Sequence, residues 1–207
     1  NAGKLEFAGL SLSARQVGGD FYDLVYIDET RALMVIADVM GKGVPAAMFA
    51  AILRSLFRAA PELMGSPAAL MDRVNRLIYE ELSAVDMFVT AQLVYIDQAE
   101  GQLITANAGH CPLLVSDKNG NVREFAPEGM PIGILPDTRF EDESMSLEGI
   151  QRILLYTDGL TEARNSDGDF FQDAKLTELL CGIQASSAKE LKVKLEHQLA
   201  SFQGEAA

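Results

Sequence analysis

Hydrophobic and polar positions alternate in the first 40 residues, which is the pattern of strands with one buried face. This alternation predicts a strand over residues 5–12, although it breaks near Gly9. It also predicts a hairpin with strands over 21–27 and 33–39, because the polar tetrapeptide at 28–31 separates them as a turn. The chain is therefore expected to open with antiparallel β-structure.

After the hairpin, the spacing of the apolar residues changes from that of strands to that of helices. Pro45 stands where the first turn of a helix tolerates proline, and residues 46–60 are rich in helix formers. A second helix is predicted to begin with Ser66 as its N-cap and Pro67 as its first residue. Its apolar positions recur at helical spacing: Leu70, Val74, Leu77, Ile78 and Leu82.

Strands and helices then follow one another in blocks. Short apolar runs predict strands over residues 88–96, 102–108, 113–115, 122–125 and 153–156. A helical pattern covers 176–200 and is broken near 182–187. Blocks of this kind are typical of the α+β class with antiparallel sheets. Because no repeat, low-complexity tract or linker interrupts the chain, we predict a single domain over residues 1–207.

The composition restricts the possible partners. Lys and Arg total 17 against 30 Asp and Glu, so the formal net charge is −13. An acidic surface repels phosphate backbones and anionic lipid, so neither nucleic acid nor a membrane is a predicted partner. No apolar run approaches the roughly 20 residues of a membrane span. Two cysteines are too few for a disulfide framework, and with no signal peptide they predict a cytoplasmic protein.

Three aspartates stand where a predicted strand meets a glycine-bearing turn: Asp20, Asp38 and Asp158. A carboxylate at the end of a buried strand is costly unless it is paired or bound to a cation. Because the chain has only two histidines, oxygen ligands are the available donors, and these favour Mg²⁺ or Mn²⁺ over zinc. The alternative interpretation is that each aspartate is a turn or N-cap residue.

Five motifs, three of which contain these aspartates, occur in order, at residues 17–23 (VGGDFYD), 37–47 (ADVMGKGVPAA), 87–91 (MFVTA), 107–112 (NAGHCP) and 156–163 (YTDGLTEA). Together they resemble the SpoIIE/RsbU-like branch of the metal-dependent (PPM, type 2C-like) serine/threonine protein phosphatases, over about residues 13–180. The resemblance implies an α+β fold, a four-layer αββα sandwich of two antiparallel sheets flanked by helices.

The resemblance also implies the site residues. Asp38 would bridge two Mn²⁺ or Mg²⁺ ions, the backbone carbonyl of Val39 would be a further ligand, and Asp158 would bind one of the ions. Asp20 would lie at the same centre, directly or through water. A water held between the ions would attack phosphorus in line. Asp38 and Asp158 would therefore be catalytic as well as metal-binding residues.

Two further positions concern the substrate phosphate and the leaving group. Arg15 is a candidate for binding the phosphate, because distant members of the wider family carry an Arg at similar spacing; a surface salt bridge is its other interpretation. Those members also place a His two residues after the bridging aspartate, where this chain has Met40. Metal-bound water or His110 would have to supply the proton instead, and His110 is interpreted first as a structural residue.

The implied substrate is a phosphoserine or phosphothreonine on a partner protein, typically a STAS-type anti-sigma-factor antagonist. The chain is predicted to be the C-terminal output domain of a longer regulator with an upstream receiver or sensor domain, and a homodimer is a further expectation. The branch usually closes with a strand carrying Asp-Asp-x-Thr, which this sequence lacks, so the final strand is predicted to be missing. Two functions stay open: an active phosphatase, and a catalytically impaired binding or scaffold module with the same fold.

Overall fold

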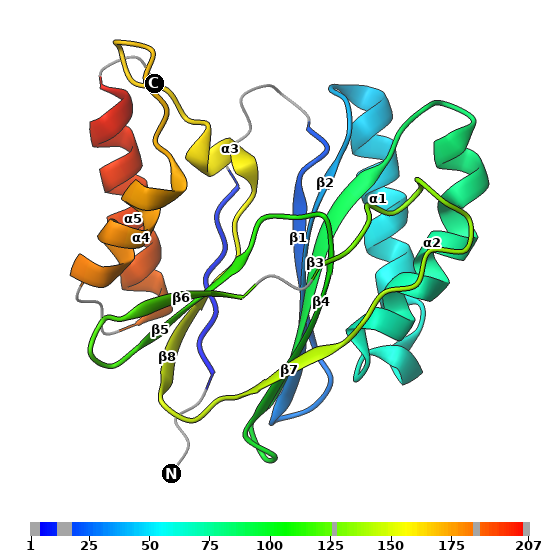
Figure 1. Ribbon diagram of the computed structural model, residues 1–207, viewed down its shortest axis with the longest axis horizontal. Coiled ribbons are helices and arrows are strands. Elements are labelled where there is room, and N and C mark those ends of the chain that lie inside the picture. Colours follow the sequence, from blue (N-terminus) through cyan, green and yellow to red (C-terminus); the bar gives the residue numbers. More distant parts are fainter. Residues whose placement is uncertain (1–4, 12–17, 126–127, 184–186, 205–207) are drawn as a thin grey trace. The chain divides into compact units, whose positions relative to one another are not determined.

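The computed structural model describes residues 5–11, 18–125, 128–183 and 187–204, which form two compact units. The larger unit holds the described residues from Leu12 to Pro112 and from Phe125 to Glu148. The smaller unit holds those from Asn1 to Ser11, Leu113 to Glu124 and Gly149 to Ala207. Each unit has a sheet and helices of its own (Figure 1). The prediction of a single domain over residues 1–207 stays a prediction.

The larger unit is a five-stranded antiparallel sheet with the strand order β1-β2-β3-β4-β7. Its strands are β1 (Phe21–Tyr26), β2 (Arg31–Val39), β3 (Val89–Asp97), β4 (Gln102–Ala108) and β7 (Glu143–Ser146). Its helices are α1 (Val44–Arg58), a short 3₁₀ turn (Pro61–Leu63) and α2 (Pro67–Ser83). The β1–β2 hairpin and both long helices are confirmed where the sequence predicted them. Ser66 caps α2 as expected, since its hydroxyl oxygen accepts the Ala69 N–H at 3.3 Å.

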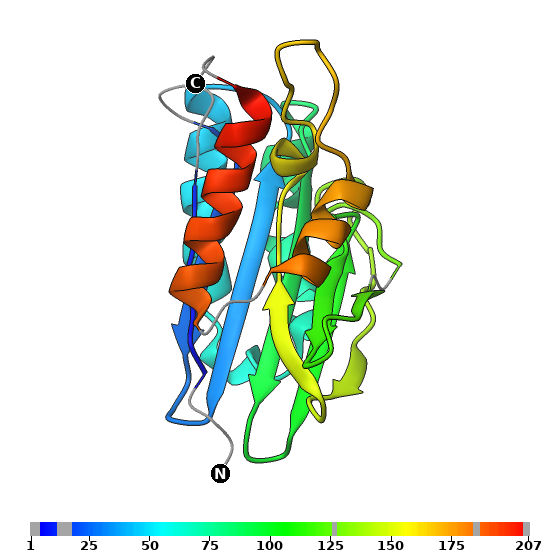
Figure 2. The ribbon, with the colours of Figure 1, turned by 90° about the vertical axis from the view of Figure 1, so that its left-hand side faces the viewer.

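The smaller unit has a three-stranded sheet with the order β6-β5-β8. Its strands are β5 (Leu113–Asp117), β6 (Val122–Phe125) and β8 (Ile150–Leu154), and its helices are α3 (Asp158–Thr161), α4 (Asp173–Gly182) and α5 (Ala188–Gln203). Helices α4 and α5 lie side by side (Figure 2). The ammonium group of Lys175 in α4 lies 4.1 Å from the ring centroid of Phe202 in α5, which ties the two helices together. Arg152 of β8 donates to the Ile183 carbonyl just after α4, at 2.9 Å.

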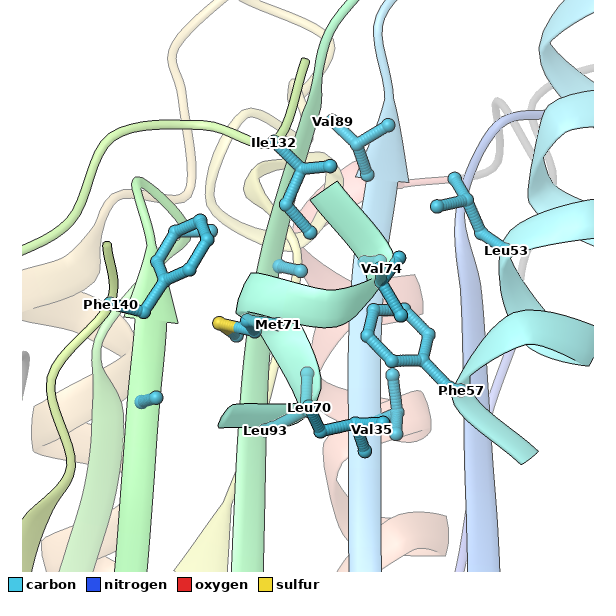
Figure 3. Close-up of a cluster of buried hydrophobic side chains, with 14 of the residues drawn as sticks. Val35, Leu53, Phe57, Leu70, Met71, Val74, Val89, Leu93, Ile132 and Phe140 are labelled. Carbon is cyan, nitrogen blue, oxygen red and sulfur yellow. The ribbon is translucent and has the colours of Figure 1, made fainter. Parts of the chain in front are cut away.

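Alternate residues of the larger sheet form one buried apolar face. In β2 these are Leu33, Val35, Ala37 and Val39, none more than 1% exposed. Figure 3 shows the helix side chains that pack with this face, Leu53 and Phe57 of α1 and Leu70, Met71 and Val74 of α2. A buried side chain of this size stabilises the fold by roughly 1.5–3 kcal/mol. This packing fixes which side of each strand faces the helices, so Asp38, between Ala37 and Val39, points to the opposite face.

The α+β class with two antiparallel sheets and flanking helices is confirmed, but two strand predictions are wrong in detail. Residues 5–11 belong to no strand of the structure, and residue 12 lies outside the described residues. β8 ends at Leu154, two residues before the predicted end of its strand. β7 was not predicted, because Met145 is the only apolar residue in it. No described helix has the length and apolarity needed to cross a bilayer.

Candidate functional site

The predicted site residues are divided between the two units. Asp20, Asp38 and Val39 belong to the larger unit, and Asp158 belongs to the smaller one. Arg15 lies outside the described residues, so its predicted role in binding phosphate stays a prediction.

The β1–β2 pairing brings Asp20 and Asp38 together. Phe21 pairs with Ala37, and the N–H of Val39 donates to the Gly19 carbonyl at 3.4 Å, so the register continues one step and places Asp20 opposite Asp38. Directly opposite residues project to the same face with Cβ atoms about 4.5–5.5 Å apart. Two carboxylates therefore share the open end of the hairpin, on the sheet face that points away from α1 and α2.

The Val39 carbonyl lies against Gly19. A Cβ atom at position 19 would overlap the carbonyl oxygen of Val39, so the close approach of the two chains requires glycine there. Just beyond, Gly41 and Gly43 have φ of 106° and 76°, which lets the chain turn from β2 into α1. Glycine at position 19 thus lets β1 approach the carbonyl of Val39, the predicted main-chain ligand, which directly follows Asp38 in β2.

Thr90 and His110 extend this row, and sequence reasoning gave Thr90 no role. Thr90 lies at the start of β3 directly opposite Asp38, and its Oγ1 is 2.9 Å from Nδ1 of His110, which follows β4. The His110 main chain is held at both ends by one side chain: its N–H donates to Asn107 Oδ1 at 2.7 Å, and its carbonyl accepts from Asn107 Nδ2 at 3.1 Å. The presence of Thr90 in the third motif was the only signal in the sequence.

A loop held by the buried Asn75 of α2 lies next to this end of the sheet. The Asn75 side chain is 0% exposed; it accepts from the Gly133 N–H at 2.9 Å and donates to the Leu135 and Pro136 carbonyls at 2.9 and 3.2 Å. Ile132, in the same loop, exchanges two 2.9 Å main-chain hydrogen bonds with Val89. The loop therefore braces the strand that carries Thr90.

Asp23 has a different role from its neighbour Asp20, because it faces α1. Its carboxylate is 7% exposed and forms ion pairs with Arg54 and with Arg58, whose Nη2 donates to Oδ1 at 2.7 Å. Burial acts to raise the pKa of Asp23, but the Arg58 hydrogen bond and the charges of Arg54 and Arg58 outweigh it and hold that pKa below its ordinary value. Asp23 thus fixes β1 to α1.

Asp158 lies at the start of a helix rather than at the end of a strand. It is the first residue of α3, with an exposed side chain, and the N–H of Glu162 donates to its main-chain carbonyl at 2.7 Å. It lines an open hollow of about 510 Å³ in the smaller unit, together with Thr161, Glu162, Phe170, Gln172, Asp173 and Ala174. Its carboxylate is accessible to a ligand there.

The donor set of the larger unit fits a hard divalent cation. Two carboxylates and a main-chain carbonyl offer oxygen alone, which suits Mg²⁺ or Mn²⁺. Among the residues that the structure describes, no three His, Cys, Asp or Glu side chains form a group able to hold a metal ion. Asp20, Asp38 and Val39 are thus the predicted metal-site residues that the structure brings together.

The fold is similar to that of PP2C-type phosphatase domains. The SiaA-PP2C domain of Pseudomonas aeruginosa matches with a TM-score of 0.73 and 28% identity, over 91% of this chain and 76% of that one. Residues 28–207 match the family described as Stage II sporulation protein E (SpoIIE). The chain belongs to the SpoIIE family, in its RsbU-like branch.

Curated relatives agree with this assignment. The phosphoserine phosphatase RsbU of Bacillus subtilis is 30% identical over 200 residues, which are 96% of this chain and 59% of RsbU. Protein IcfG of Synechocystis is 32% identical over 194 residues, which are 81% of this chain and 30% of IcfG. The chain therefore spans little more than half of the first relative and less than a third of the second.

Proposed function

We propose that this chain is a metal-dependent phosphatase acting on phosphoserine or phosphothreonine in a partner protein. The observation that carries the proposal is the pairing of Asp20 with Asp38 beside the Val39 carbonyl, in a chain of the SpoIIE family. The name of the relative RsbU, a phosphoserine phosphatase, supports the substrate class. The scaffold alternative is not favoured, because that relative carries an enzyme's name.

The chain's own residues would hold and orient the reacting groups. Asp38, with Asp20 opposite it and the Val39 carbonyl beside it, would hold Mn²⁺ or Mg²⁺, and Asp158 is retained as a proposed ligand of one ion. When bound, such ions supply a water acidic enough to attack phosphorus and neutralise the phosphate oxygens. Met40 offers no proton at its position, so the acid for the leaving group must come from elsewhere.

The proposed partners follow from the family assignment. We infer that the substrate is a phosphorylated anti-sigma-factor antagonist and that a receiver or sensor domain regulates the chain as part of a longer cytoplasmic protein. A homodimer stays a prediction. The greater length of the relatives RsbU and IcfG supports a regulatory segment. The charge of −13 supports a protein substrate rather than a nucleic acid.

The decisive experiment measures Mn²⁺-dependent phosphate release from a phosphoserine protein by the wild type and by Asp38→Asn. We expect release that EDTA abolishes, and a loss of at least 100-fold in Asp38→Asn with an unchanged melting curve in the absence of metal. Asp28→Asn is the matched control, because Asp28 is an exposed carboxylate at the other end of the same hairpin. Equal activity of wild type and Asp38→Asn would refute the proposal.

A further inference from the structure

A hydrogen bond between β3 and the loop after β4 ends directly across from the central carboxylate of the site. Thr90 pairs with Asp38 in the β2–β3 register, and the Oγ1 of Thr90 is 2.9 Å from Nδ1 of His110. Thr90, like Asp38, lies on the sheet face away from α1 and α2, since its neighbours Val89 and Ala91 belong to the core. One hydroxyl therefore stands between an imidazole and the row of carboxylates.

The imidazole is held in place through its main chain. Asn107 accepts from the His110 N–H and donates to the His110 carbonyl, at 2.7 and 3.1 Å. Gly109, with φ of 69°, forms a bridge to Ala91, and a Cβ atom at position 109 would meet Pro131 at 3.0 Å. These contacts do not involve the ring, so a substitution of the His110 side chain should leave the loop in place.

The donors and acceptors decide which way this hydrogen bond runs. A threonine hydroxyl has one hydrogen, and a carboxylate can only accept. If Nδ1 of His110 is bare, Thr90 donates its hydrogen to the ring and turns only lone pairs toward Asp38. If Nδ1 carries the hydrogen, Thr90 accepts it and keeps its own hydrogen for the carboxylates. The negative charges of Asp20 and Asp38 on the same face favour the second arrangement, because they attract the hydroxyl hydrogen.

We propose that His110 and Thr90 are a positioning pair for Asp38: His110 Nδ1–H donates to Thr90 Oγ1, and this turns the Thr90 hydroxyl hydrogen toward the Asp38 carboxylate. The pair thereby holds the Asp38 carboxylate in one orientation for binding a metal ion. This inference rests on the proposed function, because it assigns the pair a task at the proposed metal site. Groups that orient a ligand in this way change metal affinity or activity by about 10–100-fold when they are removed.

The tautomer of His110 is the first test, and it needs no activity. The chain contains only two histidines, His110 and His197, so ¹⁵N-histidine labelling gives two ring patterns, and His197→Gln leaves the one from His110. A long-range ¹H–¹⁵N spectrum tells a ring nitrogen that carries hydrogen from a bare one. We expect hydrogen on Nδ1 of His110. A bare Nδ1 with hydrogen on Nε2 would overturn the proposal.

The second test measures Mn²⁺ binding by calorimetry on the full chain. We expect Thr90→Val to weaken binding about 10-fold or more, and Thr90→Ser, which keeps the hydroxyl, to stay within about 3-fold of the wild type. His110→Ala should match Thr90→Val, while His110→Asn should recover part of the loss, because its amide offers a donor near the Nδ1 position. His197→Gln is the matched control and should bind as the wild type does.

The double variant Thr90→Val/His110→Ala separates a pair from two independent residues. If both act through one hydrogen bond, the double variant binds Mn²⁺ no more weakly than the worse single variant. Two losses that multiply would overturn the proposal, as would wild-type binding by Thr90→Val. If the wild type binds Mn²⁺ and the pair behaves as expected but no phosphate is released from any phosphoprotein, the proposed function fails and the positioning pair stands.

Discussion

Replacing Asp23 with asparagine should destabilise the fold by about 2 kcal/mol at neutral pH and by progressively less in acid. The substitution keeps the size of the side chain and its Oδ1 acceptor. It removes the charge, and it turns an NH₂ group toward the guanidinium of Arg58, where an acceptor is needed. Arg54 loses its carboxylate partner as well.

The magnitude follows from the number of hydrogen bonds and their exposure. A hydrogen bond to a charged group contributes about 1.5–3 kcal/mol net, and Asp23 accepts two from Arg58 and a longer one, at 3.3 Å, from Arg54. The arginine side chains are 45% and 52% exposed, so water screens the pairs and takes over part of the lost bonding. The net loss of stability in Asp23→Asn is therefore about 2 kcal/mol, which corresponds to a decrease of about 4–8 °C in Tm for a chain of this size.

The pH dependence has a definite sign. Because the pKa of Asp23 in the folded chain is lower than the ordinary 3.8, the contribution of the ion pair is complete above that ordinary value. It is lost as the pH falls through the folded pKa, since the protonated carboxyl then resembles the amide. The stability difference between wild type and Asp23→Asn should therefore be constant between pH 5 and 7 and shrink below about pH 4.

Urea denaturation at a series of pH values measures this difference. Asp28→Asn is the control: the Thr30 N–H at 2.9 Å and Arg31 Nε at 2.6 Å donate to Asp28 and lower its pKa to about 2, but its side chain is 39% exposed. Its substitution should cost much less than that of Asp23. A loss below about 0.5 kcal/mol for Asp23→Asn at pH 7, or an equal loss for the exposed pair, would refute the reasoning from burial.

Three further outcomes are expected. Gly19→Ala should lower stability by about 1–3 kcal/mol in urea melts and weaken Mn²⁺ binding. Gly18→Ala should do neither, because its Cβ would have no heavy atom nearer than 4.0 Å. Equal effects of the two variants would contradict the close approach of Gly19 to the Val39 carbonyl. Asn75→Ala should lower the free energy of unfolding by about 2–4 kcal/mol, because three main-chain groups of the loop lose their partner. Arg76→Ala, at an exposed position of the same helix, should change it little. Similar urea melts of the two variants would contradict the bracing role of Asn75. Mn²⁺ should raise the Tm of the wild type but not of Asp38→Asn, and a common shift would place the metal elsewhere.

Strong periodicity explains which parts of the fold could be predicted. The β1–β2 hairpin and α2 have unbroken apolar patterns and recognisable turn or cap residues, and the structure confirms both. The pattern over residues 5–11 is broken by a glycine, and its few apolar residues predicted a strand that does not form. β7 has one apolar residue in four, so only its pairing with β4 identifies it.

The candidate site also has a part that the sequence could predict and a part that it could not. The motif order was enough to select Asp20 and Asp38, and the hairpin register places them opposite each other. The contact between Thr90 and His110 joins residues twenty positions apart, one on β3 and one just after β4, so it depends on the β3–β4 register and on the loop after β4. No local pattern of hydrophobic residues carries that information.

The hairpin that carries the site offers a place for protein engineering. Asp20 and Asp38 lie at its open end, and the turn at residues 27–31 closes its other end. Extra residues inserted in that turn leave every pairing between the strands unchanged. One extra residue inside β2, by contrast, would exchange the two faces of the strand beyond it and drive the Asp38 carboxylate into the apolar layer under α1. Reporter tags or sensor modules should therefore be grafted into the turn.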